Sequence, residues 1–514
     1  MTLQENPAGR QVARAAGLVM ALFVLSRLTG LARQILVGAL FGTSPDYDAY
    51  VAAFRLPDML FQLVAGGALV SALLPTYTTL RTQEGPARAW TLVSEIVTLV
   101  LVVLTVGAGV LALVAQPLVR YVLVPDFTPA QQFLTASLLR VLLMSTVIFG
   151  LSGIAMSVLN AHQHFFLPAL APSLYNLGII GGALLLGPWW GVHGLAWGVV
   201  FGALMHLLVQ IPGLRRLGMP LSPRLRWRDP AVQHVIRLMA PRVLGLAAVQ
   251  INFLVTTILA SGLPPGRLSA LDYAFRVMLL PLGIFAQAVG TAAFPTFARQ
   301  AAAQQWETLR RTLVQLVRSV TFLTMPATMG LWWLAWPLIA VLFQRQAFDA
   351  TSTALTAAAL RAYVVGLGGH ALVEILARAF YALHDTRTPV VIGVLAMGLN
   401  VIFSIWWVQF WQHIGLALAN SVATLLEAAA LLVVLHRRGY VRNLGDIGKP
   451  LFGQGLATLG MGGVLWGTLT LTAAAGAGVQ LMAGLAAGSI AYLLLAVLLG
   501  QPEVRALWRL VRSR

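Results

Sequence analysis

The chain has 514 residues, of which 59% are hydrophobic and only 10% are charged, and its formal net charge is +18. Soluble proteins carry about 25% charged residues, so this composition excludes a soluble enzyme and a disordered chain. The absence of cysteine also excludes a disulfide scaffold. What remains is a helical protein that crosses a membrane many times.

Apolar stretches of about 20 residues are long enough to cross the roughly 30 Å hydrocarbon core of a bilayer as helices. Such stretches lie at 14–41, 48–79, 90–118, 133–160, 165–187, 190–212, 232–261, 268–298, 311–343, 352–381, 388–411, 414–436, 450–473 and 477–500. The sequence therefore predicts an all-α integral membrane protein with about 14 transmembrane helices.

Basic residues gather in alternate loops between these stretches. One side carries the basic segments at 10–14, 81–88, 215–228, 299–311, 387, 437–449 and 505–514, whereas the other side carries only Arg120, Arg267 and Arg345. By the positive-inside rule, this pattern predicts a multi-pass protein with both termini in the cytoplasm. We expect no nucleic-acid partner, because no segment is polar enough to form a basic soluble face.

The sequence also repeats itself at a spacing of 215–221 residues. The matching pairs, in chain order, are 26–32 with 241–247, 53–55 with 274–276, 74–77 with 294–297, 116–118 with 336–338, 139–140 with 360–361, and Pro168 with Pro389. The repeat unit contains six spans, an even number, so both copies have the same orientation. Parallel repeats of this kind are typical of transporters that work by alternating access.

The repeat predicts the domain organisation. We expect a six-helix lobe at 1–213, a cytoplasmic surface linker at 214–230, a second six-helix lobe at 231–440, two extra transmembrane helices at 441–502 and a basic cytoplasmic tail at 503–514.

Arginine inside the predicted spans is the main functional signal. A charge at mid-bilayer costs at least about 2.5–3.5 kcal/mol and normally faces a partner or a wet cavity, and the arginine fork matches phosphate geometry. The candidate substrate-binding residues are Ser26, Arg27, Arg33, Asp48, Arg55, Arg242 and Arg276. An alternative interpretation is structural: Arg33 and Arg55 pair with Asp48 and Asp58 as clamps, or extend from helix ends to the interface.

Fewer residues suit an ion site. The candidate ion-coupling residues are Asp272, Asn252, Asn400 and Glu427, whereas Glu374 is expected to form a salt bridge with Arg378 one helical turn later. We expect no cofactor and no bound metal; a coupling monovalent cation or the membrane potential would supply the energy. Enzyme motifs such as G-x-S-x-G, a Walker loop and H-E-x-x-H are absent from the sequence, so we predict a protein that is not an enzyme.

Several motifs resemble one known family. The segments 26–33 and 48–58, followed by 67–69, 74–75, 125–127, 166–172, 273–276 and 342–344, are similar to those of the MurJ (MviN) lipid II flippases. These proteins belong to the multidrug/oligosaccharidyl-lipid/polysaccharide exporter superfamily, and the resemblance covers nearly the whole chain. It implies fourteen helices, as two lobes of six plus two.

The resemblance also implies a function. Members of the family move a polyprenyl-pyrophosphate-linked peptidoglycan precursor, lipid II, to the outer leaflet of the bacterial inner membrane. By analogy, Arg27, Arg33, Asp48 and Arg276 would lie in a central cavity, and 450–500 would form a groove for the lipid tail. The implied partners are lipid II, membrane lipids and other cell-wall synthesis proteins, with the chain acting as a monomer.

The sequence departs from the family pattern at four positions. Phe61 and Gln62 replace a basic pair after the Leu-Pro motif of the second span, Gly66 replaces an acid, and Phe275 stands where the family often has an acid. These departures keep two alternatives open: a flippase for another polyprenol-linked oligosaccharide, and a drug or cation antiporter of the related MATE group. An inactive paralogue with a structural role is a third.

Overall fold

The computed structural model describes residues 7–65, 68–219, 222–443 and 445–504. The side chains at 7–16, 64, 65, 68, 70, 71, 241, 242, 244, 245, 248, 284 and 288 are outside the described set. Apart from one isolated bridge between Arg345 and Phe348, every regular element in these ranges is a helix. The predicted all-α fold is therefore confirmed.

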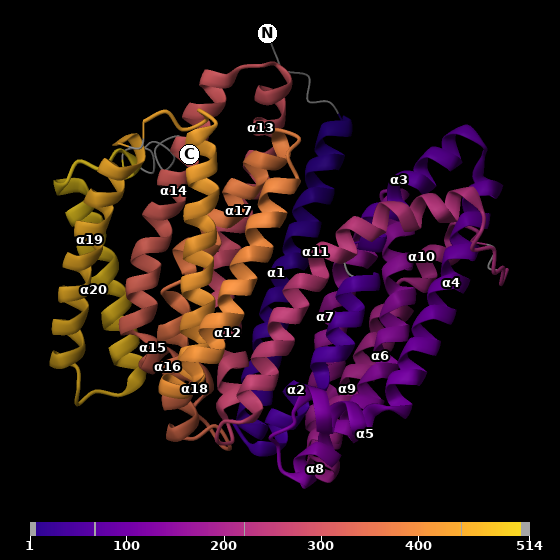
Figure 1. Cartoon of the computed structure of the whole chain (residues 1–514), viewed down its shortest axis with the longest axis horizontal. Helices are drawn as coiled ribbons and strands as arrows, with labels where there is room; N and C mark the ends of the chain where they lie inside the picture. The colour runs from indigo at the N-terminus through magenta and orange to yellow at the C-terminus, as the bar shows by residue number, and fades with distance from the viewer. Residues whose placement is uncertain (1–6, 66–67, 220–221, 444, 505–514) are drawn as a thin grey trace. The chain divides into compact units, whose positions relative to one another are not determined.

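The first half of the chain contains the elements α1 (Pro7–Phe41), α2 (Pro45–Leu60), η1 (Phe61–Ala65), α3 (Ala68–Gln83), α4 (Pro86–Leu113), α5 (Ala115–Leu118), η2 (Val119–Leu123), α6 (Pro129–Ala161), α7 (Phe166–Gly181), η3 (Gly182–Leu186), α8 (Gly187–Trp190), α9 (Val192–Leu208), α10 (Ile211–Arg216) and α11 (Pro230–Ser261) (Figure 1). The second half contains α12 (Arg267–Leu282), η4 (Gly283–Gln287), α13 (Ala288–Ala302), α14 (Trp306–Trp333), α15 (Ala335–Phe343), α16 (Ala350–Val364), α17 (Leu367–Ala382), α18 (Arg387–Arg437), α19 (Gly445–Leu471) and α20 (Ala477–Leu498). The elements labelled η are single π-helical turns.

Local chemistry sets where several helices begin. Proline is the first residue of α2, α4, α6 and α11, a position where its missing N–H removes no helical hydrogen bond. Side chains before three of these prolines cap the helix: Ser44 accepts from the Tyr47 amide at 3.3 Å, Thr128 forms a capping box with Gln131, and Asp229 accepts from the Ala231 amide. These starts are encoded within a few residues.

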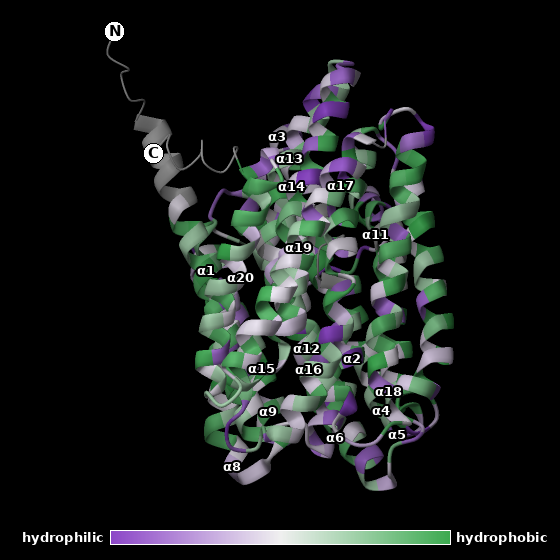
Figure 2. Ribbon diagram, turned by 90° about the vertical axis from the view of Figure 1, so that its left-hand side faces the viewer, coloured by the Kyte–Doolittle hydropathy of each residue, from purple (hydrophilic) through white to green (hydrophobic). Residues whose placement is uncertain are grey.

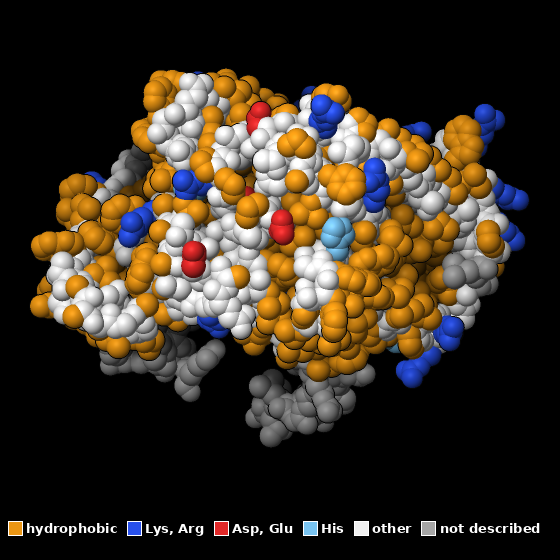
Figure 3. Space-filling view, turned by 90° about the horizontal axis from the view of Figure 1, so that it is seen from below, with side chains coloured by type: hydrophobic (Ala, Val, Ile, Leu, Met, Phe, Trp, Pro, Cys, Tyr) orange, Lys and Arg blue, Asp and Glu red, His pale blue; other side chains and the backbone are white. Residues whose placement is uncertain are grey.

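The outer faces of the helices are apolar. Figure 2 shows hydrophobic residues along the helices and hydrophilic ones concentrated toward their ends and the loops, and Figure 3 shows scattered charges among large hydrophobic areas. Leu113, Leu471 and Leu498 are each at least 80% exposed. Water would penalise so much exposed apolar surface, so these faces fit contact with lipid.

The number of membrane crossings is less sharply defined than the helical fold. Each of the fourteen predicted stretches coincides, to within two residues at its ends, with part of one helix or of a run of consecutive helices. The helix α18 breaks at Gln412, between the stretches 388–411 and 414–436. By length and composition, 8 of the described helices can cross a membrane, or up to 10 if each bent pair is one span. The chain is thus a multi-pass membrane protein, while the count of fourteen remains a prediction.

The chain divides into two compact units, Met1–Gly262 and Leu263–Arg514. In the first unit, α11 packs against α2, α3 and α4, whereas α1, its counterpart in the sequence repeat, packs against α7. The repeat predicts a lobe boundary at 214–230, before α11. The boundary of compact units therefore differs from the repeat boundary, and the predicted domain limits stay a prediction.

Local backbone features recur at equivalent positions of the two sequence copies. A sharp helix break occurs at Val114 after α4 and at Leu334 after α14, with nearly equal backbone angles (φ −91°, ψ 11° and φ −87°, ψ 8°). Single π-helical turns follow α2 and α12, at η1 and η4. Gly191 and Gln412 share a backbone conformation with positive φ (φ 55°, ψ −133° and φ 50°, ψ −132°). The sequence repeat is therefore a structural repeat as well.

A pair of arginines carries the same structural role in both copies. Arg140 donates to the carbonyl of Ala112 at 3.1 Å, and Arg361 donates to the carbonyl of Trp332 at 3.1 Å. Each guanidinium satisfies a carbonyl in the last turn of α4 or α14, where the helix has no further amide to offer. These two intramembrane arginines are thus helix caps.

Two hydrogen bonds and an ion pair of Asp385 hold the loop between α17 and α18. Asp385 accepts from the Thr388 amide at 3.0 Å and the Thr388 hydroxyl at 2.6 Å, and it pairs with Arg438 at the end of α18. Burial by itself raises the pKa of Asp385, but the bonds from Thr388 and Arg438 outweigh it and lower the pKa to about 2. The carboxylate therefore stays ionised in the folded protein at any physiological pH.

We expect Asp385→Asn to destabilise the protein near neutral pH by on the order of 1 kcal/mol, because the exposed Arg438 is screened by solvent. A lowered pKa stabilises the fold above the unfolded pKa of about 3.9, and this contribution is lost as the pH falls toward the folded value. The gap in thermal unfolding temperature between the native protein and the variant should therefore shrink from pH 6 to pH 3. A gap that is independent of pH would contradict this assignment.

Candidate functional site

Arg55 is the intramembrane arginine with the best-defined surroundings. It lies on α2, is half-buried, and its Nε donates to the Thr257 hydroxyl of α11 at 3.2 Å. Its guanidinium also lies 5.5 Å from the centre of the Phe253 ring. Both contacts hold the guanidinium plane in place. Arg55 is therefore a positioned donor group.

The other first-unit candidates lie on α1 and α2. Arg27 is exposed, Arg33 and Ser26 are half-buried, and Asp48 is buried near the start of α2. Asn176 of α7 donates to the Ser26 carbonyl and to the Thr29 hydroxyl, both at 3.3 Å. These bonds fix the face of α1 that turns toward α7 and leave the Arg27 side chain exposed.

Gly30, three residues after Arg27, lies inside a single continuous helix, α1, which runs from Pro7 to Phe41. A Cβ at Gly30 would lie 3.5 Å from Asn176 Nδ2, an ordinary contact distance. The glycine is therefore not required for space.

In the second unit, Arg276 and Asp272 form one pair. Arg276 Nε donates to Asp272 Oδ2 at 2.7 Å, and its terminal nitrogen donates to Oδ1 at 3.3 Å. The Asp272 side chain is 8% exposed and that of Arg276 is 42% exposed. The substrate candidate and the ion candidate are thus partners one helical turn apart, and the carboxylate orients the exposed guanidinium.

The other ion candidates lie on α11 and α18. Asn400 is buried and accepts from the Ser404 hydroxyl at 3.3 Å, the Asn252 carbonyl accepts from Thr256 at 3.0 Å, and Glu427 lies next to Gly393. Among the described residues, no group of three or more His, Cys, Asp or Glu is arranged to hold a metal ion. Arg242 lies on α11, and its side chain is outside the described set.

The predicted salt bridge of α17 is confirmed. Arg378 and Glu374 are 2.6 Å apart, and the Arg378 guanidinium covers Gly290 of α13. This glutamate is therefore a structural partner of Arg378.

One buried charge network was not predicted. Arg88 of α4 binds Asp229 at 2.7 Å and lies 3.7 Å from Glu84 and 3.9 Å from Glu95. Glu95 is buried, and the bonds from Arg88 and the Ala231 amide outweigh burial and lower the pKa of Asp229. Arg88 and Asp229 are 141 residues apart in sequence; only the Asp-Pro start of α11 hinted that Asp229 has a structural role.

An apolar groove of about 560 Å³ runs between α14 and α19 of the second unit. It is lined by Thr328, Met329, Trp332, Trp333, Leu459, Gly462, Gly463 and Trp466. The two glycines of α19 leave room beside the aromatic rings of α14. The size and lining suit a hydrocarbon chain.

A multi-pass helical membrane protein built on a six-helix repeat, with charged side chains inside its spans, belongs to the class of membrane transporters. The family model for the lipid II flippase MurJ matches residues 37–487. The chain belongs to the MurJ family, and the resemblance noted from the sequence is confirmed.

Relatives match over most of the chain. The lipid II flippase MurJ of Burkholderia cenocepacia is 33% identical over 433 residues, covering 83% of this chain and 84% of that protein. The protein named "Probable lipid II flippase MurJ" of Bdellovibrio bacteriovorus is 30% identical over 509 residues, covering 97% of both.

Solved structures share the fold. The structure of "Lipid II flippase MurJ, inward closed conformation" aligns with a TM-score of 0.81 at 24% identity, covering 94% of this chain and 98% of that one. An inward-facing multidrug MATE transporter of the MOP superfamily aligns with a TM-score of 0.66 at 15% identity, covering 82% and 98%. The predicted superfamily fold is therefore confirmed.

Proposed function

We propose that this chain moves lipid II from the cytoplasmic to the outer leaflet of the bacterial inner membrane by alternating access, through a cavity lined by arginine. The observation that supports the cargo most directly is family membership over nearly the whole chain, together with relatives named as lipid II flippases. In this proposal both termini are cytoplasmic, the chain works as a monomer without cofactor or metal, and its partners are membrane lipids and cell-wall synthesis proteins.

The arginine set supports the choice of a pyrophosphate head. Arg27 and Arg276 have exposed side chains, and Arg55 is held in a fixed orientation by Thr257 and Phe253. Guanidinium groups bind phosphate oxygens in pairs of charge-assisted hydrogen bonds. In our proposal these groups, with Arg33 and Arg242, replace the water around the pyrophosphate as it crosses.

Paired helix breaks support the transport motion. The breaks at Val114 and Leu334 and the π turns at η1 and η4 occupy equivalent positions in the two copies. Helix termini and π turns absorb changes of backbone angle more readily than continuous helix does. Alternating access would bend both copies at the same places.

The driving force follows from the charge of the cargo. With a negative cell interior, outward movement of an anion gains about 2.3 kcal/mol per charge per 100 mV. A coupling cation, with Asp272, Asn252, Asn400 and Glu427 as the candidate coupling residues, would help reset the empty carrier. The apolar groove between α14 and α19 would hold part of the polyprenyl tail.

A different polyprenol-linked oligosaccharide is the second candidate cargo. Phe61 and Gln62, in place of the basic pair of the family, lie in η1, where Phe61 packs on Phe149 with ring centres 4.9 Å apart. Relative to the family pattern, Phe61 and Gln62 remove two positive charges from the turn that follows α2. Such a change would weaken selection for the headgroup of lipid II.

The test is a flipping assay in liposomes that contain the purified full-length protein. We expect it to move lipid II to the outer face of liposomes carrying a negative-inside potential, faster than a second polyprenyl-pyrophosphate-linked sugar. Faster movement of the second substrate would favour the alternative cargo. Movement of neither lipid, together with exchange of a cationic drug for Na⁺ or H⁺, would favour the MATE-like antiporter.

A further inference from the structure

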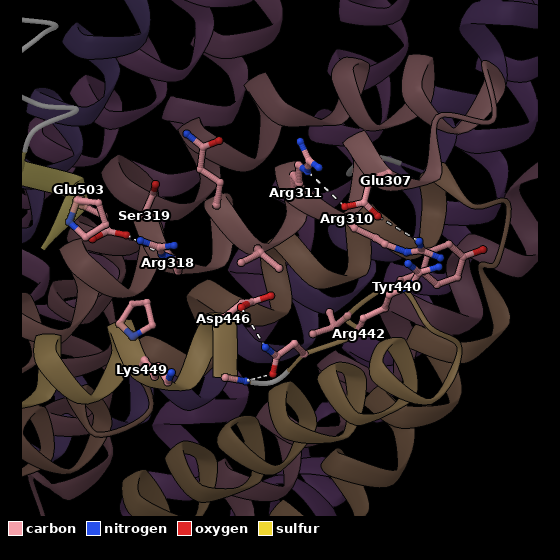
Figure 4. A pocket seen from close by; sticks show the side chains of 17 residues that line it. Glu307, Arg310, Arg311, Arg318, Ser319, Tyr440, Arg442, Asp446, Lys449 and Glu503 are labelled. Atoms are coloured by element: carbon pink, nitrogen blue, oxygen red, sulfur yellow. Dashed lines mark hydrogen bonds and ion pairs between the residues drawn. The ribbon is translucent and has the colours of Figure 1, made fainter.

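A basic pocket of about 650 Å³ lies in the second unit, away from the arginines assigned to the cargo (Figure 4). Five basic side chains line it: Arg310, Arg311 and Arg318 of α14, Arg442 of the following loop, and Lys449 of α19. Three acids, Glu307, Asp446 and Glu503, also line it. The pocket therefore carries an excess of positive charge.

The acids of the pocket are already engaged. Glu307 pairs with Arg310 at 3.4 Å and with Arg311 at 3.3 Å, and Asp446 accepts from Asn443 at 3.2 Å. Within the part of the chain that the structure describes, neither Arg442 nor Lys449 forms an ion pair, and both are exposed. Two cations are thus available to a further anion.

The pocket already holds one carboxylate group, that of Glu503. Arg318 Nε donates to the Glu503 carboxylate at 2.9 Å, and the Glu503 side chain is only 9% exposed. Glu503 is supplied by the segment after α20, which brings its carboxylate to the α14 side of the pocket (Figure 4). A chain carboxylate therefore occupies one cationic position, whereas Arg442 and Lys449, on opposite sides of Asp446 in Figure 4, carry no such partner among the described residues.

The depth of the pocket points to a lipid. Its α14 residues run from Glu307 to Ser319, across the predicted start of a span at 311, and its α19 residues run from Gly445 to Pro450, where the next predicted span begins. Pro502 and Glu503 follow the predicted end of the last span at 500. Three helix ends thus place the pocket at the level where the hydrocarbon meets the headgroups.

We propose that this pocket binds the phosphate of an anionic phospholipid headgroup from the surrounding leaflet. Arg442 and Lys449 supply the positive charge that attracts the phosphate, while Val314 and Pro450 contact the glycerol and the first methylenes of the acyl chains. Charged groups at this depth gain attraction for anionic lipids on the cytoplasmic surface. This site does not depend on the identity of the transported cargo.

The experiment uses the full-length protein in nanodiscs and in native mass spectrometry, with phosphatidylglycerol as the probe and phosphatidylcholine as the neutral comparison. We expect the double variant Arg442→Gln/Lys449→Gln to bind phosphatidylglycerol at least about tenfold more weakly than the native protein, because the pocket loses two positive charges that no acid of the described chain neutralises. Phosphatidylcholine binding should not change.

A matched control removes two exposed charges elsewhere in the second unit. Arg387→Gln/Arg437→Gln lies outside the pocket and should keep affinity for phosphatidylglycerol within about twofold. Equal losses in the two double variants would overturn the proposal, because general surface charge would then explain the binding. Unchanged affinity in Arg442→Gln/Lys449→Gln would overturn it as well.

A third variant moves the affinity in the opposite direction, which misfolding cannot imitate. Glu503→Gln releases Arg318 from its carboxylate, so we expect tighter binding of phosphatidylglycerol. Weaker binding would contradict a competition between Glu503 and the lipid phosphate.

A final competition experiment tests whether the pocket recognises a lipid headgroup or any free anion. Inorganic phosphate at millimolar concentration should not displace phosphatidylglycerol, because it lacks the acyl chains that contact Val314 and Pro450. Displacement by inorganic phosphate at the same concentration as the lipid would overturn the assignment to a lipid.

Discussion

Arg276→Ala and Arg27→Ala are each expected to abolish rescue of a bacterium depleted of its own flippase, under conditions where the native chain restores growth. Each lost charge-assisted hydrogen bond to phosphate costs about 1.5–3 kcal/mol, or roughly ten- to a hundredfold in binding. The measurement is colony formation, with the amount of each variant in the membrane fraction determined in parallel.

Arg299→Ala is the matched control for these variants. Arg299 is an exposed residue near the end of α13 whose described contact is a 3.5 Å hydrogen bond to Thr296. We expect this variant to restore growth like the native chain. If Arg27→Ala and Arg276→Ala both rescue as well as Arg299→Ala, the proposed arginine-lined cavity fails.

A double variant separates binding from clamping at Arg276. If Arg276 acts only as the structural partner of Asp272, then Asp272→Asn should impair the protein equally, and Arg276→Gln/Asp272→Asn should recover part of the loss. If Arg276 binds the pyrophosphate, the double variant stays inactive although its thermal stability recovers. The comparison of growth with stability therefore decides between the two interpretations of this pair.

The second large effect concerns packing of α7 and the following turn η3 against α9. A Cβ added at Gly182 would lie 2.3 Å from the Gly198 Cα, and one at Gly178 would lie 2.3 Å from the Gly202 Cα. Because backbone meets backbone, no side chain can rotate away, and small residues of this kind are what allow membrane helices to approach closely. We expect Gly182→Leu to lower the free energy of unfolding by at least about 3 kcal/mol.

The neighbouring glycine supplies the control for this prediction. Nothing lies within 4 Å of a Cβ at Gly181, so Gly181→Leu should leave stability unchanged or raise it slightly through better helix propensity. Size-exclusion chromatography after heating, in detergent, measures both variants. Equal unfolding temperatures for Gly181→Leu and Gly182→Leu would show that the α7–α9 approach is looser than the structure indicates.

The arginines illustrate which features of the site could be predicted from the sequence and which could not. Their presence inside apolar spans and their recurrence in the two copies marked them as constrained, but not what constrains each one. Arg140 and Arg361 are helix caps, Arg378 pairs with Glu374, and Arg55 bonds a residue 202 positions away. A cap, a salt bridge and a cavity donor look alike in a hydropathy pattern, because all three are charges in apolar surroundings.

The sequence by itself determined the properties that depend on neighbouring residues. Membrane insertion follows from the hydropathy of each stretch, helix starts follow from proline and capping residues, and the repeat follows from motifs in a constant order. The MurJ family was recognisable from the same motifs, at 26–33 and 48–58.

Only the tertiary structure decided which distant groups meet. The pairing of Arg88 with Asp229, the placement of α11 against α2 and α3, and the convergence of α14, α19 and the segment after α20 on one basic pocket each join residues far apart in the chain. Inside a bilayer all these helices are similarly apolar, so hydropathy does not choose partners. Close packing of small residues and satisfaction of buried polar groups make that choice.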